Sequence, residues 1–147
     1  MLYNKPTAKL PMVFTAQSKK RYYCRDAVCE FVFNQGALPI NPFRLYGYFL
    51  ADRVQRDLVR QANNNLVRLC EQLWVFGNTI ADGVLFEIEY ARKLNKPIQF
   101  FSIDSRADQI KAVELKNLEF EAEVYASTEM TRTQLIAKIT AVLCDSI

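Results

Sequence analysis

Histidine is absent from the 147-residue chain. Without it the chain has no Ser-His-Asp or Cys-His triad, no histidine-ligated metal and no imidazole for proton transfer. Any enzymatic chemistry must therefore rely on carboxylates, lysines, tyrosines or cysteines.

Glycine is scarce, with four residues in the whole chain. Neither G-x-G-x-x-G nor G-x-x-x-x-G-K-[ST] occurs, so a dinucleotide fingerprint and a P-loop are disfavoured. No apolar run approaches the roughly 20 residues that span a bilayer. The first six residues also lack the apolar stretch of a signal peptide. We therefore expect a soluble cytoplasmic protein with no membrane partner.

Paired cysteine motifs are missing as well. None of the four cysteines forms a C-x-x-C pair, so we expect buried or idle thiols, with no metal and no cofactor. The net charge of +3 is too small to indicate a nucleic-acid partner. Half of the residues are hydrophobic and 24% are charged, which is ordinary for a globular protein. The length suits a single domain over residues 1–147.

What the chain does contain is an alternation of short apolar runs and helical patterns. Strands that are apolar throughout and separated by helices predict a parallel sheet covered on both sides. We therefore expect a flavodoxin- or Rossmann-like α/β fold, with five parallel strands in the order 2-1-3-4-5 and helices on both faces. The strands expected to be central and buried are 13–16, 73–76 and 98–101.

The remaining elements follow from local signals. Asp52 is expected to cap a long helix whose apolar stripe would be Val54, Leu58, Ala62, Leu66 and Leu69. Other helices are expected over 21–35, 83–94 and, more weakly, 107–116, with a half-exposed edge strand over 118–124. The last helix begins near Thr131 in a capping-box pattern, with Leu135, Ile136, Ile139, Val142 and Leu143 on its buried face.

Glu87 is the most conspicuous candidate for chemistry. On an ideal helical wheel it falls among the apolar residues Val84, Ile88 and Ala91. A carboxylate in that position costs free energy unless it is paired or used. The first turns of a helix favour its ionised form, which is the form needed for nucleophilic attack on an anomeric carbon. A salt bridge, or a flank position that reaches water, is the alternative.

The edge formed by the carboxyl ends of the strands is the expected place for a ligand. After the first strand come Gln17, Ser18 and Lys19, then Lys20 and Arg21 at the start of a helix, which would suit a phosphate. A solvated basic turn is the alternative.

A second loop at the same edge is rich in aromatic residues. Asn41, Phe43 and Tyr46 lie in this loop, where aromatic rings could stack on a nucleobase or on one another. The run 63–65 consists of three asparagines, which are mediocre helix formers and invite a hydrogen-bonding role, either structural or toward a ligand.

The order of these features resembles the nucleoside 2-deoxyribosyltransferase-like superfamily, which includes the 2′-deoxynucleoside 5′-phosphate N-hydrolases. Its most specific part is Gly83, four residues before Glu87, with Ala91 four residues further on. The likeness covers roughly residues 13–102 and is closest at 40–43, 63–66 and 73–77.

The resemblance implies that Glu87 is a nucleophile that forms a covalent ester with the sugar. Transferases of the superfamily usually carry an aspartate six residues before the glutamate, where this chain has Ala81, so Asp82, five before it, is the candidate for the second catalytic role. Substrate contacts are expected from Gly77, Asn78 and Gly83. The expected activity is cleavage of the N-glycosidic bond of a (deoxy)nucleoside or its 5′-monophosphate, by an N-glycosidase or a deoxyribosyltransferase. An NAD-type glycohydrolase and a non-catalytic nucleotide- or partner-binding module are the alternatives. A homodimer or higher oligomer is expected.

Overall fold

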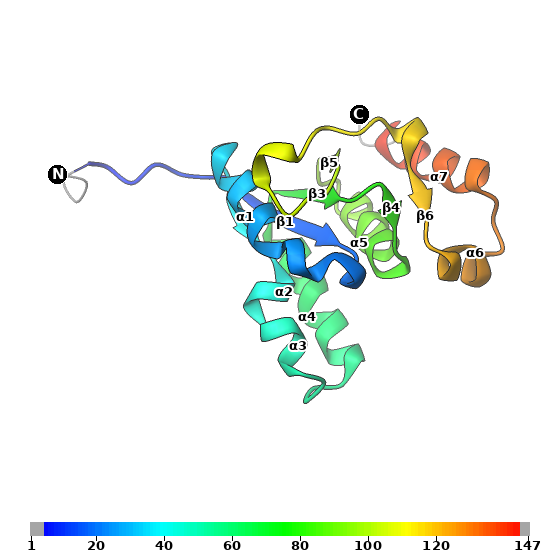
Figure 1. Cartoon of the computed structure of the whole chain (residues 1–147), viewed down its shortest axis with the longest axis horizontal. Helices are drawn as coiled ribbons and strands as arrows, with labels where there is room; N and C mark the ends of the chain where they lie inside the picture. The colour runs from blue at the N-terminus through cyan, green and yellow to red at the C-terminus, as the bar shows by residue number, and fades with distance from the viewer. Residues whose placement is uncertain (1–4, 145–147) are drawn as a thin grey trace.

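The computed structural model describes residues 5–144, with the backbone alone for 141–144. Along the chain the elements are β1 (Met12–Gln17), η2 (Lys19–Cys24), α1 (Arg25–Asn34), β2 (Leu38–Ile40), α2 (Pro42–Leu45), α3 (Gly47–Leu50), α4 (Arg56–Leu69), β3 (Gln72–Phe76), β4 (Thr79–Ile80), α5 (Asp82–Lys93), β5 (Ile98–Phe101), η3 (Ala107–Gln109), η4 (Leu115–Asn117), β6 (Glu119–Phe120), α6 (Ala122–Thr128) and α7 (Arg132–Cys144). Figure 1 shows their arrangement.

The main sheet has four parallel strands in the order β2-β1-β3-β5. β1 and β3 are mainly apolar, apart from Thr15, Gln17 and Gln72, and side chains on both faces of these strands are buried. On one face Val13 and Trp74 pack with α1, and on the other Phe14 and Val75 pack with α5. The predicted α/β class, with a parallel sheet between two layers of helices, is confirmed (Figure 1).

The predicted five-strand order is present only in part. Among the described residues β5 lies at an edge of the main sheet, with Gln99 exposed, so the expectation that all three long strands are central was wrong for β5. The expected edge strand over 118–124 is also different. Its first part is β6, which pairs with β4 in a separate two-stranded sheet, and its second part is the helix α6.

The alternation of apolar residues in that segment has another cause. Leu118, Phe120 and Val124 all reach the same core as α5, from a turn, a strand and a helix respectively, whereas Ala122 is exposed. A period of two therefore arose there without a continuous strand.

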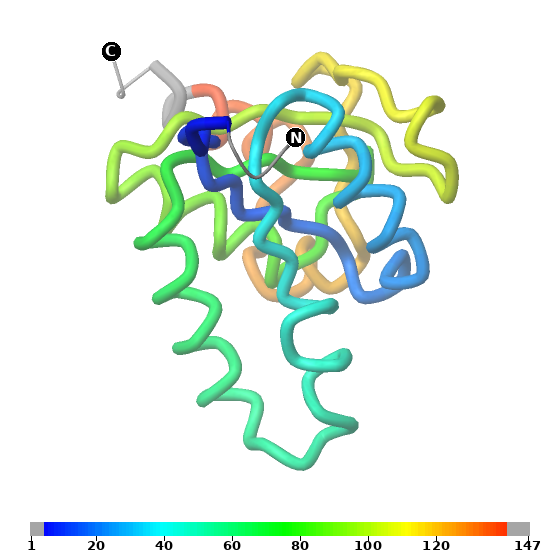
Figure 2. The backbone as a smooth tube through the Cα atoms, turned by 90° about the vertical axis from the view of Figure 1, so that its left-hand side faces the viewer, coloured from blue at the N-terminus to red at the C-terminus, as the bar shows by residue number. Residues whose placement is uncertain are grey.

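The long helix differs most from expectation. α4 begins at Arg56 with Gln55 at the N-cap, whereas Asp52 lies in the preceding turn with a positive φ of 62°. Leu58 and Leu69 of the expected stripe are 58% and 68% exposed, while Val67 is buried. Figure 2 shows the reason: α4 and the segment before it extend together away from the sheet, so little of the helix lies on the core.

The other helices are closer to the prediction. The segment 21–35 starts as η2 and continues as α1, and the weak helix over 107–116 is two short turns, η3 and η4. Thr131 and Gln134 form the predicted capping box at the start of α7, with reciprocal bonds of 3.2 and 2.8 Å.

The buried face of α7 agrees with the prediction as far as the side chains are described. Leu135 and Ile139 are buried, whereas the side chains of Val142, Leu143 and Cys144 lie outside the described part. Within residues 5–144 no helix is both long and apolar enough to cross a membrane.

Candidate active site

A cavity of about 540 Å³ opens beyond the carboxyl end of β1. Its walls come from five segments: the end of β1 with the turn after it, the segment 42–54, α4, the start of α5, and the residues around the start of α6. The position agrees with the general rule that ligands of open parallel sheets bind outside the carboxyl ends of the strands.

Glu87 lines this cavity from α5. The helix packs Val84, Ile88 and Ala91 into the core, and Glu87 lies beside them, half-buried. Burial raises the pKa of its carboxyl from 4.5 to about 8, although the Arg60 guanidinium lowers it in part. No hydrogen bond or ion pair reaches Glu87 from residues 5–144. Desolvation therefore outweighs the helix dipole, and the expected ionised form is disfavoured at neutral pH.

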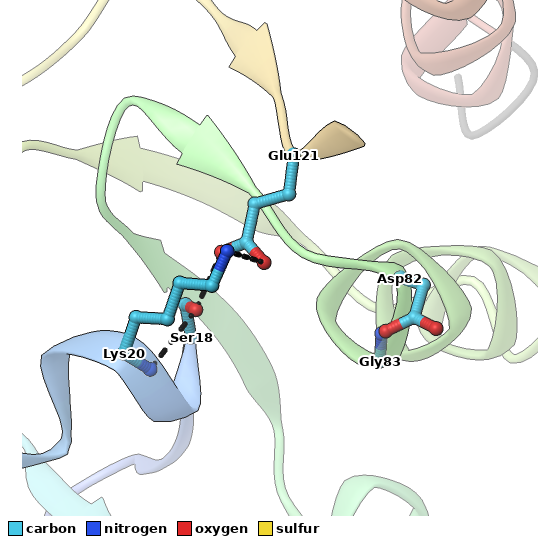
Figure 3. A network of polar contacts seen from close by, with 5 residues as sticks. All are labelled: Ser18, Lys20, Asp82, Gly83 and Glu121. Atoms are coloured by element: carbon cyan, nitrogen blue, oxygen red, sulfur yellow. Dashed lines mark hydrogen bonds and ion pairs between the residues drawn. The ribbon is translucent and has the colours of Figure 1, made fainter. Parts of the chain in front are cut away.

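Asp82 and Gly83 also line the cavity, at the first turn of α5. The Asp82 side chain is exposed, and its Oδ1 accepts a hydrogen bond of 2.7 Å from the backbone N–H of Gly83 (Figure 3). Asp82 is the first residue of α5, and this bond engages one of the free N–H groups of the first turn.

The turn after β1 already holds an anion. Ser18 is the N-cap of η2, accepting a bond of 3.2 Å from the Lys20 N–H, and its hydroxyl donates to Glu121 Oε2 at 2.6 Å. Lys20 Nζ lies 3.4 Å from Glu121 Oε1 (Figure 3). The carboxylate of Glu121 therefore binds Ser18 and Lys20, which were expected to bind a phosphate.

Glu121 and Glu123 form a pair of carboxyls on the same wall. Burial would raise the pKa of Glu121, but hydrogen bonds with Ser18 and Glu123 and the charge of Lys20 outweigh it, so the pKa is lowered. The pKa of Glu123 is raised, first by its hydrogen bond to Glu121. Both residues line the cavity, so one wall presents two neighbouring carboxyls whose pKa values are shifted in opposite directions.

Two other predicted substrate residues bind each other. Asn41 donates from Nδ2 to Gln17 Oε1 at 2.8 Å, and Gln17 Nε2 donates to the carbonyl of Arg21 at 2.9 Å. Gln17 and Lys19 line the cavity, whereas Asn41 and Arg21 do not. Arg21 instead donates to the carbonyl of Ile103 at 3.3 Å.

The aromatic loop contributes rings to the cavity. Phe43 contacts Tyr48 and Phe49, with ring centroids 5.2 and 5.0 Å apart, and all three line the wall. Tyr46 does not. The backbone from Gly47 to Asp52 has positive φ throughout, a left-handed turn that costs non-glycine residues about 1–2 kcal/mol each.

Gly77 and Asn78 also lie outside the cavity lining. Gly77 has a φ of 114°, which favours glycine, and the backbone carbonyl of Asn78 accepts a bond of 2.7 Å from the Glu119 N–H. Their roles in this structure are to turn the chain after β3 and to hold β6.

Residues 13–101 match the model of the family described as "Domain of unknown function (DUF7768)". The chain belongs to this family. The DUF7768 match includes β1, α4 and Glu87, but it ends before Glu121 and Glu123. Comparison with curated proteins gives no match.

Three solved structures are similar to this DUF7768 chain. The CMP N-glycosidase BcmB of Clostridium botulinum is 16% identical, with a TM-score of 0.47, covering 62% of this chain and 71% of its own. A 2-deoxyribosyltransferase from Bacillus psychrosaccharolyticus is 13% identical, with a TM-score of 0.47 and coverages of 84% and 95%. A 2-deoxyribosyltransferase from Leishmania mexicana is 18% identical, with a TM-score of 0.47 and coverages of 78% and 85%. At these scores the likeness extends to neither substrate nor mechanism.

Several cavity residues are missing from the sequence-based prediction. Arg56 and Arg60 lie on successive turns of α4, and their regular spacing was a usable signal. Glu121 carried no such signal in the sequence, because it lies 103 residues after its partner Ser18. Asn63 and Asn64 belong to the asparagine run for which the sequence left a structural and a ligand-binding role open. Both line the cavity, and each has a buried Oδ1 with no hydrogen-bond partner in the described structure.

Proposed function

We propose that this DUF7768 protein cleaves the N-glycosidic bond of a (deoxy)nucleoside or its 5′-monophosphate, as an N-glycosidase or deoxyribosyltransferase, through a covalent ester on Glu87. The single observation that carries the proposal is the position of Glu87. Its carboxyl lines a cavity of about 540 Å³ without a bonding partner in residues 5–144. A cavity of this volume suits a small organic ligand.

The proposed chemistry requires Glu87 to lose its proton. A carboxylate oxygen of Glu87 then attacks the anomeric carbon, while the bond to the base breaks and its electron pair stays on the base nitrogen. Water, or a second base, next attacks the same carbon and displaces the carboxylate. Arg60 favours the ionised form because it lowers the pKa of Glu87 against the effect of burial.

The leaving base takes up a proton, and we assign that proton to Glu123. The residue lines the same cavity, and its pKa is raised by the hydrogen bond to Glu121, so it retains a proton for longer than an isolated carboxyl. Because one carboxyl must be ionised and the other protonated, kcat/KM is expected to follow a bell-shaped pH profile. Glu123→Gln should remove one limb of the bell.

The aromatic loop supports a flat ligand group. Phe43, Tyr48 and Phe49 line the cavity wall in contact with one another, and a nucleobase can stack on an aromatic ring of this kind. Asn63 and Asn64 add amide oxygens that would accept hydrogen bonds from sugar hydroxyls or amino groups.

Base release is the direct test. The protein is incubated with ribo- and 2′-deoxyribonucleosides, their 5′-monophosphates and NAD, and the products are separated by chromatography. The parent is expected to release a free base. Glu87→Gln should lower the rate by at least about a thousandfold, because a covalent route is lost. Glu89→Gln on the same helix is the matched control. Cleavage by Glu87→Gln within tenfold of the parent rate would exclude Glu87 as the nucleophile.

One observation favours a different function. A carboxyl with a pKa of about 8 is largely protonated at neutral pH, which would suit a site that binds a nucleotide without turning it over. Binding of nucleotides without base release between pH 6 and 9 would support this non-catalytic module. Release of nicotinamide from NAD alone would support a glycohydrolase for pyridine nucleotides.

We also propose that the protein forms a homodimer or larger oligomer. Large apolar side chains are exposed around the projecting helix, namely Leu45, Leu50, Leu58, Leu69 and Phe86. Large apolar side chains exposed on neighbouring elements are often covered by a second protein molecule. Light scattering at micromolar concentration should give at least twice 17.0 kDa, and a monomer mass would overturn this part.

A further inference from the structure

The side of α4 that lines the cavity is mainly polar, and Val59 is its one apolar residue. Arg56, Arg60, Asn63 and Asn64 all line the cavity, at spacings that place them along one side of the helix. Core packing does not explain the pattern, because Val67 is the one residue of α4 that is fully buried. A helix side of this kind is suited to contact with a polar ligand.

Within residues 5–144 Arg56 and Arg60 are not paired with a carboxylate, although the charge of Arg60 reaches Glu87 and lowers its pKa. The Arg60 guanidinium lies 5.6 Å from the centre of the Phe86 ring, an arrangement that holds the cation in place and leaves its N–H groups available. Two guanidinium groups one helical turn apart are suited to a phosphate, which they can bind through several N–H groups at once.

The turn after β1 is a weaker phosphate site than the sequence indicated. Ser18 and Lys20 are bonded to Glu121, which a phosphate would have to displace. A phosphate there would also lie beside the carboxyls of Glu121 and Glu123, and like charges repel.

The cavity therefore has two unlike sides. Four of its carboxyls come from α5 and the start of α6: Asp82, Glu87, Glu121 and Glu123. Two of its three cations come from α4, and the third, Lys19, follows β1. Asp52, in the turn before α4, is the exception to this separation. A ligand with one anionic end would fit with that end on α4.

We propose that Arg56 and Arg60 of α4 bind the phosphate of a nucleoside 5′-monophosphate, and that this pair selects phosphorylated substrates over free nucleosides. The inference rests on the proposed function for the identity of the ligand. In this arrangement Asn63 and Asn64, a turn further along α4, accept hydrogen bonds from the sugar, and Glu87 on α5 faces its anomeric carbon.

Binding measurements test the inference independently of catalysis. Calorimetric titrations use the Glu87→Gln background, so that no ligand is consumed. The probes are deoxycytidine, deoxyguanosine, their 5′-monophosphates and inorganic phosphate. The monophosphates should bind more tightly than the nucleosides, and inorganic phosphate should compete with the monophosphates. Added salt should weaken the monophosphate complexes more, because the contacts are charged and partly exposed.

Substitutions in α4 and in the residues just before it test where the phosphate binds. Arg56→Ala should weaken monophosphate binding by about ten- to a hundredfold and leave nucleoside binding within about twofold. Arg53→Ala removes the same charge from a nearby exposed position that does not line the cavity, so it should change neither. Unfolding curves show whether each variant is folded.

The opposite results are equally clear. The inference is overturned if nucleosides bind as tightly as monophosphates, if no phosphorylated probe binds, or if Lys19→Ala rather than Arg56→Ala removes the preference. Base release by the parent is scored separately. Cleavage without a preference for phosphate would leave the proposed function standing and remove only the role of α4. Phosphate-dependent binding without cleavage would support the role of α4 and remove the proposed function.

Discussion

Two carboxyls of the same cavity, Glu87 and Glu121, have opposite pKa shifts although both are withdrawn from water. Glu87 has no bonding partner in the described structure, and burial raises its pKa to about 8. Glu121 accepts a hydrogen bond from Ser18 and pairs with Lys20, and its pKa is lowered. The difference shows that partners rather than burial determine the charge of a carboxyl in this cavity.

The comparison also separates structural from reactive roles. The Glu121 carboxylate is bonded to Ser18 through Oε2 and paired with Lys20 through Oε1, and a carboxylate held in this way stabilises the fold and is a weaker nucleophile. A carboxyl without partners costs stability and is available for chemistry. Glu121 thus ties α6 to the turn after β1, and Glu87 is the group left for a substrate.

Removal of Glu121 should have the largest effect on the fold. Glu121→Ala leaves the buried Ser18 hydroxyl without its acceptor and Lys20 without its anion, so the free energy of unfolding should fall by about 2–3 kcal/mol. Urea denaturation at pH 7 measures the change. Glu121→Gln retains an acceptor for Ser18 and should lose about half as much. Equal losses for the two variants would mean that the packing, rather than the hydrogen bond, is what matters.

Glu87 should show the opposite dependence on pH. The unfolded chain releases this proton near pH 4.5 and the folded chain near pH 8. The stability conferred by the bound proton is therefore complete below about pH 4.5 and is lost as pH rises through 8. Between these values the parent should lose about 1–3 kcal/mol relative to Glu87→Gln, an amount reduced because the cavity side of the carboxyl remains open to water. Parallel stability curves for the two proteins would contradict the raised pKa.

The sequence predicted one member of this pair and missed the other. Glu87 was visible because a charged residue interrupts a regular apolar pattern on α5, and local periodicity is enough to show that. Glu121 acquires its role from β6, a two-residue strand that pairs with β4 across a long sequence separation. No local pattern encodes such a contact, because it depends on where the chain returns after β5.

The same distinction holds for the fold. β1 and β3 were predictable because unbroken apolar runs specify burial on both faces. α4 was misread because a stripe was assigned to Leu58 and Leu69, and the helix turns both to solvent. Its side toward the cavity carries Arg60 and Asn63, and a polar helix side is recognised as an inner wall only when the cavity it faces is known.

A change at Ser18 should have an intermediate effect. Its hydroxyl has two functions, since it caps η2 by accepting from the Lys20 N–H and donates to Glu121. Ser18→Ala should therefore lower the free energy of unfolding by about 1–2 kcal/mol, as the sum of a lost cap and a lost buried bond. Ser18→Asn retains a capping group without the short bond to Glu121. A stability for Ser18→Asn equal to that of Ser18→Ala would show that the cap contributes nothing.

Lys20 should have the smallest effect on stability. Its side chain is 61% exposed although Glu121 is buried, and a pair with one end in water contributes little because solvent and salt screen it. Lys20→Ala should change the free energy of unfolding at pH 7 by no more than about 0.5 kcal/mol, and less in 1 M salt.

The effect of Lys20→Ala on Glu121 should be easier to detect, since Lys20 is one of the groups that lower the pKa of that carboxyl. The lowered pKa gives stability that is present above the ordinary value of 4.5 and is lost as pH falls through the folded pKa. The variant should therefore begin to unfold at a higher pH than the parent in an acid titration followed by circular dichroism. Lys19→Ala, which removes the same charge from the neighbouring residue, is the control and should unfold in acid like the parent. An unchanged acid midpoint for Lys20→Ala would show that the hydrogen bonds of Glu121 alone keep it ionised.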